Sequence, residues 1–364
     1  MSIKLSDNII FVAGGTGGHI FPALAVYNLF NNEGNKLFFA TDHRGLRFEE
    51  ILNINPFLIK ALGFEGKGLF KKIVSLVFII CETFRAIFFI KKNKIKIIIG
   101  FGSYVQVPFV LAGLIMKKNI ILHEGNAVIG KANKIFWKYI KVRTSAYNLK
   151  KFFPDTVQVG MPVRGQITKL YNNKYEPKTS KGLFNLLILG GSQGSNILST
   201  NLSKVIIKLP IYLRKNIIIF HQVRNEHLSI VKKIYKKNNI KSYVDSFFKD
   251  ISNYIGKASL VISRAGSSTI HENIIAGIPA IYFPINKSVG NHQYENALVL
   301  KKNNAAWIFN EEDIGTDSFL KALSQIISQP ELLKQFSFNN KNLGKPFASQ
   351  RFKEIILGLE VKDV

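Results

Sequence analysis

Residues 14–22 read Gly-Gly-Thr-Gly-Gly-His-Ile-Phe-Pro and follow the apolar run 9–13. A buried strand that enters a glycine-rich turn is how α/β proteins bring backbone N–H groups and a helix N-terminus to a phosphate. His19 adds acid–base chemistry to this loop. The positive end of a helix dipole disfavours the imidazolium form, so the neutral ring can accept a proton. The alternative is a histidine that only hydrogen-bonds the loop.

A second glycine-rich turn, residues 190–195, follows the apolar run 186–189 about half a chain later. The first turn lacks the Gly-Lys-Ser/Thr ending of a P-loop and is an imperfect dinucleotide fingerprint. Each alone could be a tight strand-to-helix turn without a ligand. One such loop in each half of the chain predicts two nucleotide-type domains that face each other across a cleft.

A third segment, Ser263–Glu272, begins at a predicted strand end, turns on glycine and enters a helix that we expect Ser267 or Ser268 to cap. Glu272 falls one turn into that helix, where its carboxylate can accept hydrogen bonds from both hydroxyls of a ribose. The spacing from Thr269 to Glu272 also fits a capping box, in which the glutamate serves only the helix.

Other polar clusters follow predicted strand ends, where side chains are more often functional than core-forming. These clusters are residues 100–104, 123–126, 160–164 and 291–297. Any one of them could be an ordinary solvated loop. No group of histidines, cysteine and carboxylates has metal-ligand spacing, so we expect neither a metal nor a cofactor.

Secondary structure must bring these residues to a common edge of a sheet. The sequence predicts alternating strands and helices that could do so. The first half has strand candidates at 8–13, 36–40, 57–59, 95–100 and 119–123, with helical patterns at 22–31, 45–53, 70–91 and 108–117. The pattern restarts at Leu183, with strands at 184–189, 217–221, 242–244, 260–263 and 280–283 and helices at 196–208, 226–237, 251–257, 268–276 and 293–303. This alternation predicts the α/β class, with doubly wound parallel sheets in two Rossmann-like domains. Residues 171–180 are predicted to form a surface connection, and residues 317–359 helices interrupted near Pro330 and 344–346.

The length of 364 residues fits two domains. The single cysteine, Cys81, excludes an intramolecular disulfide framework and lies in an apolar run, which predicts a packing role. The net charge of +27, from 50 Lys and Arg against 23 Asp and Glu, is either compositional drift towards lysine or an attraction to anionic membrane. The chain carries no recognised nucleic-acid motif.

The apolar segment 73–90 contains Glu82 and Arg85. A charged pair within about 18 residues argues against a membrane-spanning helix and favours an amphipathic or half-buried one. The lysines that flank it could dock its apolar face on anionic headgroups; they are Lys71, Lys72, Lys91 and Lys92. The alternative is an ordinary buried helix.

Seven of these motifs follow one another in the order typical of a known family: 14–22, 100–104, 123–126, 160–164, 190–195, 263–272 and 292–297. Together they resemble the MurG family of peptidoglycan glycosyltransferases, which have the two-domain GT-B fold. The resemblance implies an N-terminal acceptor domain, 1–163, and a C-terminal UDP-sugar domain, 164–340. A helix at about 341–364 would pack back on the first domain.

The resemblance also implies a reaction. The family transfers N-acetylglucosamine from UDP-N-acetylglucosamine to lipid I, an undecaprenyl-diphospho-muramoyl peptide, and gives lipid II with inversion at the anomeric carbon. This reaction belongs to peptidoglycan synthesis, and so to cell shape and division. The protein would be peripheral at the cytoplasmic face of the bacterial inner membrane. Its implied partners are the two substrates, an anionic membrane surface and other cell-wall synthesis proteins, without nucleic acid.

The resemblance assigns residues to both substrates. The donor side comprises Asn126, Arg164, Ser192, Gly194, Phe248, Arg264, Ser267, Ser268, Thr269, Glu272 and Gln293. Among these, Glu272 would hold the ribose, Ser192 the diphosphate and Phe248 the uracil pocket, while Gln293 and Asn126 would contact the sugar. The acceptor side comprises Thr16, Gly17, Gly18 and His19.

An inverting transfer needs a base for the acceptor hydroxyl and a stabiliser for the leaving UDP. His19 is the first candidate for the base and Glu124 the second. The chain departs from the family at Gly125, where glutamine is usual, and at Met161, where asparagine is usual. The loss of a side chain at Gly125 puts donor selectivity in doubt.

Three other functions compete with this hypothesis. Another GT-B transferase could act on a different lipid or glycan. A nicotinamide-dependent dehydrogenase needs an acidic residue about twenty positions after its glycines; Asp42 is roughly placed, but the glycine spacing is wrong. A membrane or nucleic-acid binder without catalysis should have damaged motifs, and these are intact.

Overall fold

The computed structural model describes residues 8–30, 36–60, 69–177, 183–190, 195–285 and 289–360, with side chains except at 69–73, 289, 359 and 360. The chain divides into two compact units. One unit runs to Arg164 and includes the residues from Lys345 onward, and the other is Gly165–Gly344.

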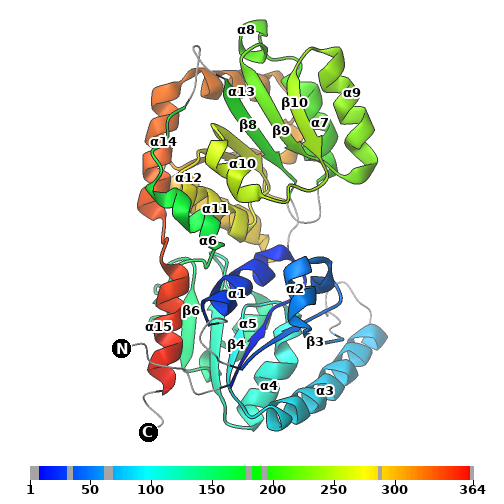
Figure 1. The fold of residues 1–364 in the computed structure, drawn as a ribbon, viewed down its shortest axis with the longest axis vertical. Helices are drawn as coiled ribbons and strands as arrows, with labels where there is room; N and C mark the ends of the chain where they lie inside the picture. Colours follow the sequence, from blue (N-terminus) through cyan, green and yellow to red (C-terminus); the bar gives the residue numbers. More distant parts are fainter. Residues whose placement is uncertain are drawn as a thin grey trace. The chain divides into compact units, whose positions relative to one another are not determined.

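The first unit is built on a parallel sheet with strand order β3-β2-β1-β4-β5-β6-β7 (Figure 1). The strands are β1 (Asn8–Val12), β2 (Leu37–Thr41), β3 (Phe57–Leu58), β4 (Ile95–Gly100), β5 (Asn119–Glu124), β6 (Val142–Ser145) and β7 (Val157–Gln158). Its α-helices are α1 (Gly17–Phe30), α2 (Glu49–Ile54), α3 (Leu69–Lys92), α4 (Val107–Ile115), α5 (Lys131–Phe136) and α15 (Ala348–Glu360).

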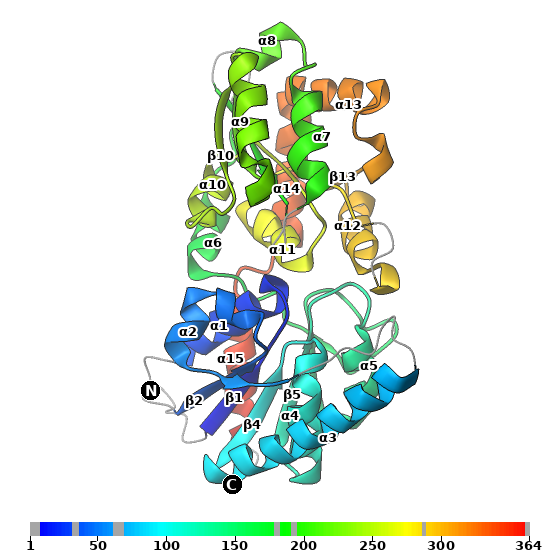
Figure 2. The same cartoon turned by 90° about the vertical axis from the view of Figure 1, so that its right-hand side faces the viewer.

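The alternation of side chains along β1 separates two hydrophobic cores. Ile9 and Phe11 pack in the core that α1, α2 and α15 cover, whereas Ile10 and Val12 pack in the core that α3, α4 and α5 cover. α15 is an integral part of the first core, where Phe352 is fully buried. Figure 2 shows α3 crossing α4, on which it packs.

The second unit holds another parallel sheet, with strand order β10-β9-β8-β11-β12-β13. Its strands are β8 (Phe184–Leu189), β9 (Ile217–Gln222), β10 (Lys241–Asp245), β11 (Leu260–Ser263), β12 (Ala280–Tyr282) and β13 (Ala306–Ile308). Its α-helices are α6 (Gly165–Lys169), α7 (Asn196–Ile206), α8 (Ile211–Arg214), α9 (Leu228–Lys237), α10 (Ile251–Lys257), α11 (Ser267–Ala276), α12 (His292–Lys302), α13 (Asp317–Ser328) and α14 (Pro330–Leu343).

The predicted class, α/β with two doubly wound parallel sheets, is confirmed. The predicted strands and helices are present, with ends that shift by a few residues. The largest shift is at α1, which begins at Gly17 rather than Pro22 because the loop glycines form its first turn. Three strands were not predicted: β6, β7 and β13.

The prediction for Cys81 was wrong. Cys81 is exposed on α3 and lines a cavity of about 620 Å³ with Lys60, Val74, Val77, Phe78, Glu82 and Arg85. Among the described residues, no helix is both long and apolar enough to span a bilayer. Glu82 is buried and forms an ion pair with Arg85, 2.7 Å away, which explains how α3 accommodates the charge.

Candidate active site

The first site lies where the order of strands reverses in the first sheet, between β1 and β4. Open α/β sheets bind ligands at the carboxyl ends of strands at such switch points, because neighbouring loops leave towards opposite faces. Val12 pairs with Gly100 at the ends of these two strands. The loop before α1 and the loop after β4 are therefore neighbours.

His19 joins these two loops. Its Nδ1 lies 3.1 Å from the carbonyl oxygen of Gly14. A carbonyl can only accept a hydrogen bond, so the neutral ring carries its proton on Nδ1 and keeps the lone pair on Nε2. The ring lies against Gly102, which has φ +96°; a β-carbon there would be 3.1 Å from Nε2. Glycine is required at that position by its conformation and by the close approach of the ring.

The sequence did not indicate the role of Asp42, which follows β2 and is only 1% exposed. Its Oδ1 accepts a hydrogen bond from the Gly15 N–H at 3.3 Å, and its Oδ2 pairs with Arg44 at 2.6 Å. Asp42 therefore holds the glycine loop that carries His19. The Asp42 carboxylate therefore bonds to protein groups, whereas the acidic residue of a dehydrogenase would bind a ribose.

Glu124 is 2% exposed and accepts four hydrogen bonds. Its Oε1 accepts from the backbone N–H and the side-chain amide of Asn126 at 2.9 and 3.0 Å. Its Oε2 accepts from the Gly130 N–H and from Asn133 Nδ2, both at 2.8 Å. The arrangement suits a residue that shapes the loop 125–130.

A buried amide chain connects Glu124 with the His19 region. Asn133 Oδ1 accepts from Gln106 Nε2 at 2.6 Å, and Gln106 Oε1 accepts from the Gly102 N–H at 2.8 Å. Gln106 and Asn133 are both buried. Because Gly102 supports the imidazole ring, this network fixes both loops of the first site together.

Arg164 ends the first unit and places its guanidinium 4.0 Å from the centre of the Phe21 ring. Phe21 packs edge-to-face on Phe48, with ring centres 5.0 Å apart. A cation over an aromatic face is attracted to it. Arg164 is thus fixed beside α1, the helix that carries His19.

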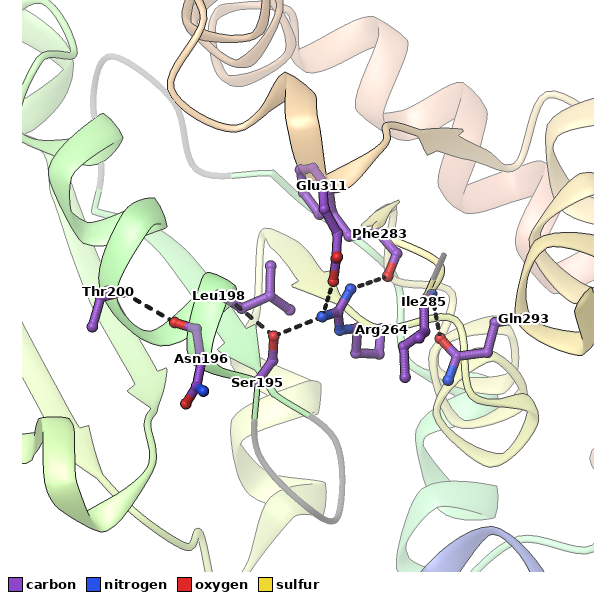
Figure 3. Close-up of polar contacts among 9 residues, drawn as sticks. All are labelled: Ser195, Asn196, Leu198, Thr200, Arg264, Phe283, Ile285, Gln293 and Glu311. Carbon is purple, nitrogen blue, oxygen red and sulfur yellow. Dashed lines mark hydrogen bonds and ion pairs between the residues drawn. The ribbon is translucent and has the colours of Figure 1, made fainter. Parts of the chain in front are cut away.

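The second site lies at the corresponding switch point of the second sheet, between β8 and β11, where Leu189 pairs with Ser263. Ser195 caps α7, because its Oγ accepts from the Leu198 N–H at 3.3 Å. Arg264 follows β11 and reaches the same serine, with Nη2 2.9 Å from Oγ (Figure 3). A helix N-terminus beside an arginine favours a negatively charged group.

Arg264 makes two further contacts in Figure 3. Its Nη1 donates to the Phe283 carbonyl at 3.2 Å, and its Nη2 forms an ion pair with Glu311. Glu311 was not predicted, since nothing in the sequence relates it to Arg264. Gln293 lies nearby, where its Oε1 accepts from the Ile285 N–H at 3.1 Å.

The start of α11 differs from the prediction. The helix begins at Ser267 with Gly266 as its N-cap, and no side chain caps it. Neither Ser267 nor Ser268 is therefore the cap, and Thr269 is the third residue of the helix, which removes the capping-box explanation of Glu272. Glu272 is buried at the sixth position of the helix.

Two buried histidines in the second unit have lowered pKa values. Burial lowers the pKa of His221 to about 3, against a hydrogen bond to the Leu198 carbonyl that raises it. Burial likewise lowers the pKa of His271 to about 4, opposed by the Ser267 carbonyl. His221 also accepts from the Tyr235 hydroxyl at 2.9 Å. Both rings are neutral near pH 7.

Known proteins share this pair of domains. Residues 9–145 match the glycosyltransferase family 28 N-terminal domain, and residues 185–355 match the family 28 C-terminal domain. The chain is 34% identical to a UDP-N-acetylglucosamine--N-acetylmuramyl-(pentapeptide) pyrophosphoryl-undecaprenol N-acetylglucosamine transferase of Paramagnetospirillum magneticum, with 96% of each chain covered. The chain belongs to glycosyltransferase family 28.

A transferase of the same name from Francisella philomiragia is 35% identical over 94% of each chain. The crystal structure of Acinetobacter baumannii MurG superposes with a TM-score of 0.77 and 26% identity, over 97% of this chain and 99% of that one. These comparisons confirm the resemblance to MurG and the GT-B fold.

The two departures from the family pattern are in contact. A β-carbon on Gly125 would lie 2.9 Å from Cε of Met161. Met161 is buried and occupies the space that a side chain at position 125 would need. The two positions at which we expected departures from the MurG pattern therefore pack as a pair.

Of the other predicted residues, Phe248 is buried against Tyr254, with ring centres 4.4 Å apart. Thr16, Gly17 and Gly18 lie at the start of α1. Ser192 and Gly194 lie outside the described residues. Within the described part of this family 28 chain, no cluster of three metal-ligating side chains occurs.

Proposed function

We propose that this protein transfers N-acetylglucosamine from UDP-N-acetylglucosamine to lipid I, with inversion at the anomeric carbon, and gives lipid II for peptidoglycan synthesis. Membership of family 28 and the activity named for its relatives support the reaction. The observation that carries the chemistry is His19, whose Nδ1 is tied to the Gly14 carbonyl at a switch point of the sheet.

His19 is the base in this proposal. The hydrogen bond from Nδ1 leaves Nε2 as the basic atom, as a general base requires. Glu124 is less suited, because four hydrogen-bond donors already occupy its two oxygens. In our proposal Glu124 instead shapes the loop of Asn126, which would contact the sugar.

The transfer is one displacement. His19 Nε2 takes the proton of the acceptor hydroxyl, the hydroxyl oxygen bonds to the anomeric carbon, and the bond from that carbon to the diphosphate oxygen breaks. The pair of electrons leaves with UDP. The N-terminus of α7 and Arg264 would stabilise the charge that develops on this diphosphate.

The other assigned residues would recognise the two substrates. On the donor side, Glu272 would bind the ribose, Phe248 would line the uracil pocket, Gln293 would contact the sugar, and Arg164, Ser192, Gly194, Ser267, Ser268 and Thr269 would complete the site. On the acceptor side, the loop of Thr16, Gly17 and Gly18 would bind the diphosphate of lipid I.

The helix α3 is the surface that we assign to the membrane at the cytoplasmic face. It exposes an apolar stripe of Leu76, Ile80, Phe84 and Phe88 at four-residue spacing, which places these side chains on one side of the helix. Phe84 and Phe88 are 68% and 70% exposed. Lys91 and Lys92 lie at the end of the helix. Such a stripe with a basic edge is typical of interfacial helices.

Transfer of labelled N-acetylglucosamine to a lipid I analogue tests the reaction and its base. We expect His19→Ala to lower kcat about 10²- to 10⁴-fold, as loss of a general base does, with little change in KM for UDP-N-acetylglucosamine. In Glu124→Gln, we expect a smaller loss of kcat than in His19→Ala, because in this proposal Glu124 shapes a loop and is not the base. Full activity in His19→Ala would remove the base assignment, and absence of transfer by the wild type would remove the proposed function.

A further inference from the structure

Glu311 is the first residue of a short 3₁₀ turn, Glu311–Asp313, which follows β13. A capping box fixes this turn: the Asn310 N–H donates to Asp313 Oδ2 at 2.7 Å, and the Asp313 backbone bonds the Asn310 side chain in return. The backbone that carries Glu311 is therefore held independently of Arg264. Figure 3 shows the Glu311 side chain pointing from this turn to the guanidinium.

The Arg264 guanidinium donates to three acceptors on three different parts of the chain. They are the Ser195 hydroxyl at the start of α7, the Phe283 carbonyl after β12, and the Glu311 carboxylate. The side chains of Arg264 and Glu311 are only 12% and 19% exposed. A guanidinium is a rigid fork on a long flexible stem, so several fixed acceptors are needed to hold it in one orientation.

Of these acceptors, only Glu311 carries a charge. Charge-assisted hydrogen bonds are shorter and stronger than neutral ones, so Glu311 contributes most to the orientation of the fork. Ser195 is the N-cap of α7, and the ion pair therefore holds the arginine against the helix N-terminus. A nucleoside diphosphate at that terminus would meet a cation already in place.

We propose that Glu311 is a positioning residue, which holds Arg264 against the start of α7 for the diphosphate of the sugar donor. This inference rests on the proposed function, because that function brings a nucleoside diphosphate to α7. It predicts that Glu311 acts on the diphosphate alone, through Arg264, and leaves recognition of the nucleoside unchanged.

Binding of UDP and of uridine to the full chain tests this inference by calorimetry. Glu311→Gln keeps the size of the side chain and removes its charge. We expect the Kd for UDP to rise about tenfold, the effect of one charge-assisted hydrogen bond, while the Kd for uridine stays unchanged. The matched control is Glu312→Gln, which removes the same charge from the exposed neighbour in the same turn and should alter neither Kd.

A second comparison separates positioning from folding. In an Arg264→Lys background the fork is absent, so Glu311→Gln should have no further effect on UDP binding. Unchanged or tighter UDP binding in Glu311→Gln would overturn the inference, as would equal weakening of UDP and uridine. Failure of the wild type to bind UDP would instead overturn the proposed function and, with it, this inference.

Discussion

At the scale of single residues, contacts between positions far apart in the sequence decide the chemistry. His19 owes its tautomer to the Gly14 carbonyl, and its loop is held by Asp42, 27 positions after Gly15. The sequence indicated His19 because a histidine in a glycine loop is informative by itself. It could not indicate Asp42 or Glu311, because an isolated acidic residue gives no sign of which buried partner the fold brings to it.

The contact between Gly125 and Met161 leads to a prediction about paired substitutions. Gly125→Gln alone should lower activity and stability, because its side chain must displace the buried Met161 methyl group. Overpacking of this kind costs about 1–3 kcal/mol. The double variant Gly125→Gln/Met161→Asn should recover most of this loss, since both positions then carry the residues usual in the family.

A double-mutant cycle checks this prediction, with urea unfolding and transfer activity measured on the wild type, both single variants and the double variant. Additive effects on both measurements would show that the two positions are independent. Coupling of more than about 0.5 kcal/mol would support the packed pair.

At the scale of secondary structure, hydrophobic periodicity was a sufficient guide wherever an element buries a regular face. The strands β4, β8 and β11 and the helix α10 have the predicted bounds, because each has an apolar run or repeat that ends at a polar or glycine residue. β6 was not predicted, since its sequence Val-Arg-Thr-Ser has no apolar run. Ser267 or Ser268 was predicted as the cap from its residue type, but the chain turns earlier, at Gly266.

The apolar stripe on α3 supports a prediction for membrane binding. Phe84→Asp/Phe88→Asp should reduce binding to vesicles with anionic lipids at least tenfold, because each buried aromatic side chain contributes about 1.5–3 kcal/mol. Lys91→Glu/Lys92→Glu should weaken binding more at low salt than at high salt. Cosedimentation with vesicles measures both effects.

A control for this experiment is Phe338→Asp on α14, since Phe338 is 65% exposed and lies in the second unit. It should bind vesicles like the wild type. Equal loss of binding in Phe338→Asp, or unchanged binding in the α3 variants, would show that α3 is not the membrane surface.

At the scale of the whole molecule, both units place their candidate site at the reversal of strand order in a parallel sheet. The repeated alternation of strands and helices was enough to predict this architecture, since parallel sheets require helical crossovers. Which loops lie side by side was harder to predict from the sequence, because it depends on which strands are neighbours in the sheet rather than on which are consecutive in the chain.

The buried histidines predict how stability depends on pH. The unfolded chain protonates His221 and His271 near pH 6.5, whereas the folded protein leaves them neutral down to pKa values of about 3 and about 4. The unfolded state therefore binds more protons below pH 6.5, and the free energy of unfolding should fall as pH decreases from about 6.5 to 4. Each histidine contributes a slope of up to about 1.4 kcal/mol per pH unit.

Urea unfolding between pH 5 and 7 measures this slope. His271→Asn should have a shallower dependence than the wild type by about one proton, whatever its absolute stability. Parallel curves for the wild type and His271→Asn would contradict the prediction.

The position of α15 has a consequence for biosynthesis. The first core contains Phe352 and Ile356, although its other members lie between Ile9 and Val159. During translation the first unit therefore cannot complete this core until the second unit has been synthesised, because α15 is made after it. At roughly 5–20 residues per second the delay is about 10–40 s. Throughout that time the face of the sheet that α15 will cover is open to chaperones and to other nascent chains.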